Sequence, residues 1–165
     1  MAPDIKAKIF FEHLLTNDTY NFLCDKPNVR TQEPLGIYSD LINCLNDIDF
    51  EEIKKNNIFL NIIFSPASNS IIKVNIPVCA KIITFDYNFL SRIPKNERIA
   101  ILLHEYGHAF NPKLMGYEGE FKADDFAITH EYGNALRNSL QRSIKEFPYE
   151  FDKPVTYQRI ERIPE

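Results

Sequence analysis

The stretch KNERIAILLHEYGHAF, residues 95–110, decides both the fold and the chemistry of this chain. Its apolar residues recur at helical spacing, and the stretch stops just before Pro112, where proline prevents a helix from continuing. Residues i and i+4 of a helix lie on one face, so His104 and His108 would project side by side. The stretch therefore predicts one helix that carries a pair of neighbouring imidazoles.

Two histidines at this spacing, with a glutamate after the first, form the pattern H-E-x-x-H. Each imidazole can place a nitrogen about 2.0–2.1 Å from one zinc ion. Glu105 would then lie one step round the helix, close enough to act as general base toward a metal-bound water. The alternative is that His104 and His108 only form local hydrogen bonds, but burying these polar groups unpaired would be costly. We therefore predict Zn²⁺ as the cofactor.

The letters HEYG occur a second time, at residues 130–133. Here Asn134 stands where the second histidine would be needed, and Gly133 interrupts the helical pattern. His130 therefore lacks a partner at i+4, and His13 stands alone in an N-terminal helical pattern. We expect neither histidine to bind the metal.

A catalytic zinc site needs a third protein ligand. Candidates after the histidine pair are Glu118, Glu120, Asp124, Asp125 and His130. Glu120 is favoured because it opens the next helical pattern, which a short loop allows to fold back antiparallel to the first. Asp124 would share its face and accept the free N–H of a ligating histidine. The alternative for Glu120 is a carboxylate that only stabilises a helix N-terminus.

The remaining sequence predicts an α+β fold. Helical patterns are expected at residues 3–24, 38–48, 120–128 and 134–147, and strands of a small mixed sheet at 57–66, 70–77 and 80–86. We predict a single domain, 1–165, with a helical N-terminal part (1–50), a catalytic core (57–147) and a C-terminal tail (148–165). A peptide substrate would pair with residues 80–86 if that strand lay at the sheet edge.

Composition narrows the classes of function. The net charge is −4 and charges of both signs are interleaved, so no nucleic-acid surface is indicated. No apolar run is long enough for a membrane span and no secretory signal is visible, so we expect a cytoplasmic protein. Cys24, Cys44 and Cys79 lack metal-site or disulfide spacing and are expected to be reduced thiols. The N-terminal helices are candidates for contact with a partner protein.

Three segments taken in order, 83–110, 120–140 and 153–163, resemble the peptidase family of the CAAX prenyl proteases and the HtpX-type proteases, which are gluzincins. The resemblance rests on HEYGH, EFKADDFA and KPVTYQRIERI and covers about half the chain. It implies His104, His108 and Glu120 as zinc ligands, with Asp124 supporting them. That family is mostly membrane-embedded and no membrane span is visible here, so the likeness is to its soluble catalytic core or to small soluble relatives.

That family often carries a His-Pro pair which helps to hold the oxyanion, and Lys153 occupies the matching position here. EFKADDFA after HEYGH also resembles the ImmA/IrrE group, soluble zinc proteases that cleave transcriptional repressors. We expect a zinc-dependent endopeptidase acting on peptides or proteins. The alternatives are a repressor-cleaving regulatory protease, a zinc-stabilised interaction module, and a latent enzyme whose tail covers the site.

Overall fold

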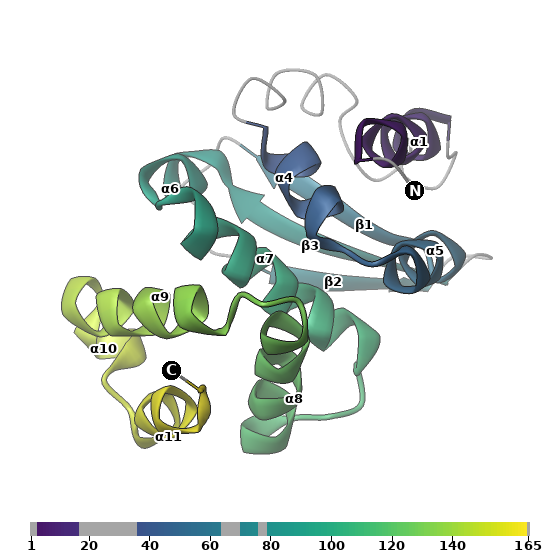
Figure 1. Ribbon diagram of the computed structural model, residues 1–165. Coiled ribbons are helices and arrows are strands. Elements are labelled where there is room, and N and C mark those ends of the chain that lie inside the picture. The colour runs from purple at the N-terminus through teal and green to yellow at the C-terminus, as the bar shows by residue number, and fades with distance from the viewer. Residues whose placement is uncertain (1–2, 17–35, 64–69, 76–78, 165) are drawn as a thin grey trace. The chain divides into compact units, whose positions relative to one another are not determined.

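The computed structural model describes residues 3–16, 36–63, 70–75 and 79–164 (Figure 1). The chain forms two compact units, Met1–Arg92 and Ile93–Glu165, and each is described by itself. The catalytic core predicted at 57–147 spans the boundary between them. Its strands belong to the first unit, and the HEYGH helix and the helix after it belong to the second.

The first unit contains a three-stranded mixed sheet, as an α+β fold requires. Its strands are β1 (Ile58–Ile63), β2 (Ser70–Asn75) and β3 (Cys79–Asp86), in the order β1-β3-β2. β3 runs parallel to β1, with Ile58 opposite Lys81, and antiparallel to β2, with Ser70 opposite Thr84. β3 is therefore the central strand. The prediction that residues 80–86 offer an edge to a substrate is wrong, because both sides of β3 are already paired.

Four helices of the first unit are described: α1 (Pro3–Thr16), α4 (Ile37–Cys44), α5 (Asp47–Lys55) and α6 (Tyr87–Arg92). The helix predicted at 38–48 is in fact split, because the Asn46 side chain accepts a hydrogen bond from Asp49 N and starts α5. Aromatic rings join the elements: Phe10 of α1 lies 6.4 Å from both Tyr38 and Phe50, measured between ring centroids. The part of the predicted first helix beyond Thr16 lies outside the described residues.

The second unit is built from helices. These are α7 (Lys95–Phe110), α8 (Gly116–Thr129), α9 (Gly133–Glu146), α10 (Pro148–Phe151) and α11 (Pro154–Arg162). α7 has the bounds expected from its sequence. The tail, for which no element was predicted, forms α10 and α11. In the described part of the chain, no helix is both long and apolar enough to cross a membrane.

The helices α7 and α8 cross at a point where glycine meets alanine. A Cβ atom at Gly107 would lie 2.6 Å from the Cα of Ala123, so only glycine permits this approach. Side chains of both helices meet around this point: His104 lies against Glu120 and Asp124, and Phe110 lies against Phe126. The antiparallel direction of α8 stays a prediction.

Candidate metal site

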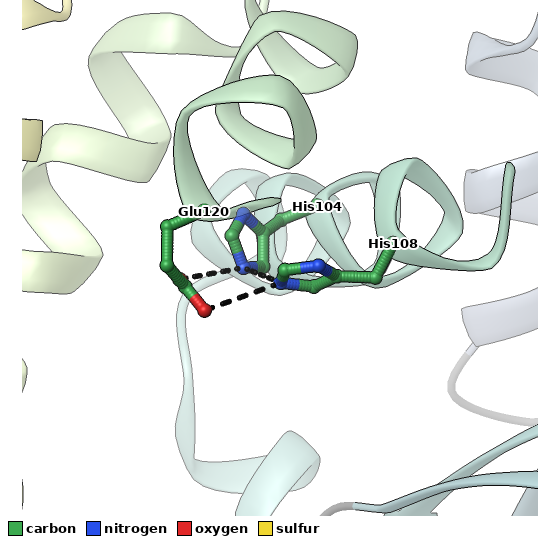
Figure 2. Close-up of side chains that lie close together, drawn as sticks. All are labelled: His104, His108 and Glu120. Carbon is green, nitrogen blue, oxygen red and sulfur yellow. Dashed lines mark hydrogen bonds and ion pairs between the residues drawn. The ribbon is translucent and has the colours of Figure 1, made fainter. Parts of the chain in front are cut away.

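Three side chains that could hold a metal ion meet where α7 and α8 cross (Figure 2). His104 and His108 lie one turn apart on α7, and their Nε2 atoms are 3.1 Å apart. Glu120 comes from the first half of α8. Its Oε2 lies 3.6 Å from His104 Nε2, and its Oε1 lies 3.5 Å from His108 Nε2. The sequence prediction thus named the three residues that converge.

The spacing of these atoms suits a metal ion. Two donors that each lie about 2.0–2.1 Å from a tetrahedral ion are about 3.3–3.4 Å apart. The separations of 3.1, 3.5 and 3.6 Å between the donor atoms are close to that value. Two imidazoles and one carboxylate are also a donor set typical of zinc. The residues therefore fit the cofactor that the sequence suggests.

Asp124 fixes which nitrogen of His104 faces the other donors. Its carboxylate is fully buried, and Oδ1 lies 2.8 Å from His104 Nδ1. Because a carboxylate can only accept, Nδ1 carries the proton and the lone pair lies on Nε2, within reach of His108 Nε2 at 3.1 Å and of Arg159 Nη2 at 3.4 Å. The supporting role expected for Asp124 agrees with this contact, because a carboxylate in this position sets the tautomer of a histidine that could bind a metal.

Arg159 of α11 is a participant that the sequence reasoning missed. Its guanidinium donates to both oxygens of Asp124, from Nε at 2.9 Å and from Nη2 at 2.7 Å. Nη1 lies 2.7 Å from Glu120 Oε2. The side chain is only 9% exposed. A signal was present: Arg159 belongs to the KPVTYQRIERI segment that carried the family resemblance, but only its Lys-Pro pair was used.

The carboxylates of the site remain charged despite their burial. Burial by itself raises the pKa of Asp124, but hydrogen bonds from His104 and Arg159 outweigh it and hold that pKa below its ordinary value. Burial also raises the pKa of Glu120. The hydrogen bond with His108 and the charge of Arg159 outweigh burial, so the pKa of Glu120 is lowered. Both groups are therefore ionised acceptors at neutral pH.

Burial lowers the pKa of His108, while the hydrogen bond with Glu120 and the charges of Glu105 and Glu120 raise it, and the net result is a raised pKa. The excess of negative charge around the imidazole favours a cation. A divalent metal ion would compete with the proton for this nitrogen.

Helix α9 contacts the first turn of α7 through an ion pair between Arg142 and Glu97. Arg142 donates to Glu97 from Nε and from Nη2, each at 2.9 Å, which is the two-bond geometry that holds a carboxylate best. Arg137 of α9 also donates to the carbonyl of Ile163, just after α11. Helix α9 thus connects the helix that supplies the histidines with the helix that supplies Arg159.

The other residues singled out from sequence lie apart from the three donors. Glu105 is half-buried on α7, near enough for its charge to act on His108. Lys153 is exposed at the start of α11, and its role at an oxyanion stays a prediction. Glu118 is exposed on α8, and Asp125 pairs with Arg162.

His130 ends α8, where its Nδ1 lies 2.8 Å from the carbonyl of Phe126. It is buried, and its ring packs at a tilt against the Phe126 ring, with centroids 4.5 Å apart. His13 packs on Phe59 in the other unit. As expected, neither histidine joins the cluster of His104, His108 and Glu120.

Comparison of the chain with protein-family models, with curated proteins and with solved structures finds no match. The function must therefore be argued from the geometry of the site itself.

Proposed function

We propose that this protein is a zinc-dependent endopeptidase. The observation that carries the proposal is the number of donors: within the described residues, the metal-binding cluster at this place consists of His104, His108 and Glu120. Structural zinc sites are usually closed by four protein ligands, whereas catalytic sites use three and leave a position for water. Asp124, the nearest further carboxylate, is engaged by His104 and Arg159 instead.

When bound in such a site, a zinc ion lowers the pKa of a water molecule toward about 7 and polarises a carbonyl group. Glu105 is the residue of the motif left free to take the proton of the attacking water and deliver it to the leaving nitrogen. Asp124 keeps His104 in the tautomer that presents Nε2. The gluzincin arrangement, the cytoplasmic location and peptide or protein substrates form part of the same proposal.

A zinc-stabilised interaction module is the competing function. It would share the metal but would not need Glu105. The donor count favours the enzyme, because a module held together by metal gains nothing from an open coordination position.

The test combines metal analysis with cleavage of an unstructured protein. The purified full chain should hold about one zinc ion, and Glu105→Gln should keep the metal but lose about 10²- to 10⁴-fold in cleavage rate. Glu118→Gln, which changes an exposed carboxylate on α8, is the matched control and should cleave normally. Cleavage that persists in Glu105→Gln would exclude this residue as the base, and zinc without any cleavage would favour the interaction module.

A further inference from the structure

Arg159 divides its donors unequally between two carboxylates of α8. Nε and Nη2 form a fork on the two oxygens of Asp124, and Nη1 alone reaches Glu120. Because Asp124 is completely buried and also accepts from His104, the fork fixes the guanidinium in one position. The bond to Glu120 therefore comes from a donor that has little freedom to move.

The two carboxylate oxygens of Glu120 lie at nearly equal distances from the histidine nitrogens. Oε1 lies 3.5 Å from His108 Nε2, and Oε2 lies 3.6 Å from His104 Nε2. A carboxylate so placed could bind a metal through one oxygen or through both. Only Oε2, however, lies 2.7 Å from Arg159 Nη1. A charge-assisted hydrogen bond of this length engages that oxygen and leaves Oε1 as the better metal donor.

We infer that Arg159 is a positioning residue which restricts Glu120 to one-oxygen metal binding and thereby keeps a coordination position open for water. The inference rests on the proposed metal site, but not on the identity of the substrate. Lysine could not replace arginine here, because a single ammonium group cannot bridge both carboxylates in a fixed fork.

Cobalt(II) is a suitable probe because its visible absorption depends on coordination geometry. Four-coordinate cobalt absorbs much more strongly than five- or six-coordinate cobalt. The full-length wild-type protein should bind about one cobalt ion with the intense four-coordinate spectrum. In Arg159→Gln, Glu120 is free to bind through both oxygens, and the band intensity per bound cobalt should fall by about half or more.

The matched control is Arg162→Gln, one turn further along α11, which pairs with Asp125 and Phe121 O instead of the site. It should keep the wild-type spectrum. Arg159→Lys retains a positive charge beside buried Asp124 and decides the question if Arg159→Gln does not fold; it too should show a weaker band.

The possible failures can be told apart. No cobalt binding by the wild type overturns the metal site and with it the proposed function. A weak wild-type band overturns the one-oxygen assignment on its own, whatever the variants do. An unchanged intense band in Arg159→Gln or Arg159→Lys overturns the role of Arg159 and leaves the metal site standing.

Discussion

At the scale of single residues, the side chain that matters most beyond the three donors is Asp124. Its fully buried carboxylate accepts from His104 Nδ1 at 2.8 Å and from the Arg159 fork. Asp124→Asn keeps the shape but removes the charge, and its amide can present a donor to the imidazole. We expect zinc affinity to fall about 10- to 100-fold, the usual cost of losing such a supporting group.

Competition with a chromophoric chelator measures this affinity. Asp125→Asn is the control, because Asp125 neighbours Asp124 in sequence but pairs with Arg162 at the surface. Equal affinities in both variants would mean that the carboxylate of Asp124 does not support His104.

At the scale of elements, α1 is attached to the sheet through a titratable ring. His13 stacks on Phe59 of β1 with an interplanar angle of 29°, and burial, with a further effect from the charge of Lys54, lowers its pKa below 6.5. The unfolded chain therefore binds this proton at higher pH than the folded chain. The stability that this site contributes is complete above the unfolded pKa and is lost as pH falls toward the folded value.

We therefore expect hydrogen exchange of α1 amides, corrected for intrinsic rates, to accelerate between about pH 7.5 and about pH 5.5. Asp47 of α5 pairs with Lys6 of α1. Its pKa is about 2, so it does not titrate in that range. His13→Phe keeps an aromatic ring on Phe59 and should remove the effect. The same acceleration in that variant would assign it to other groups.

The crossing of α7 and α8 gives a second prediction at this scale. Gly107→Ala would place a Cβ atom 2.6 Å from Ala123 Cα and 2.9 Å from Ala123 O, both backbone atoms that cannot move aside alone. We expect a loss of about 1–3 kcal/mol in the free energy of unfolding, measured in urea, with weaker zinc binding.

Gly133→Ala is the control for this change. There the nearest atoms are 3.3 and 3.4 Å away, at the side chains of Ile128 and Ile163. Those side chains can shift slightly, so a small effect is expected. If Gly107→Ala lost no more unfolding free energy than Gly133→Ala, the crossing would be shown to tolerate a methyl group.

The sequence predicted those elements whose signals are local. Helical periodicity and Pro112 gave α7 its bounds, and the i, i+4 rule paired His104 with His108. The angle between α7 and α8 was not predictable in this way, because it depends on which surfaces pack together. The contact of Arg159 with Asp124 was missed for a similar reason. The two residues are 35 positions apart, and no local sequence pattern predicts a contact at that separation.

At the scale of the whole molecule, every donor and its supporting groups lie in the unit Ile93–Glu165, while the sheet lies in Met1–Arg92. A ligand that binds only the folded state stabilises the folded region that binds it. The stabilisation is about 2.7 kcal/mol at a free ligand concentration 100 times the dissociation constant. We therefore expect zinc to slow hydrogen exchange most in α7, α8 and α11, which carry the donors and Arg159.

Exchange measured with zinc and with a chelator on the same full-length protein makes this comparison. Amides of β1 and β3 should change little, since the metal bonds reach none of the sheet residues and compact units can open separately. His108→Gln removes one donor and should abolish the protection in the second unit. Protection that extended equally over the sheet would mean that the two units unfold as one cooperative body, so that metal bound by the helices stabilises the strands as well.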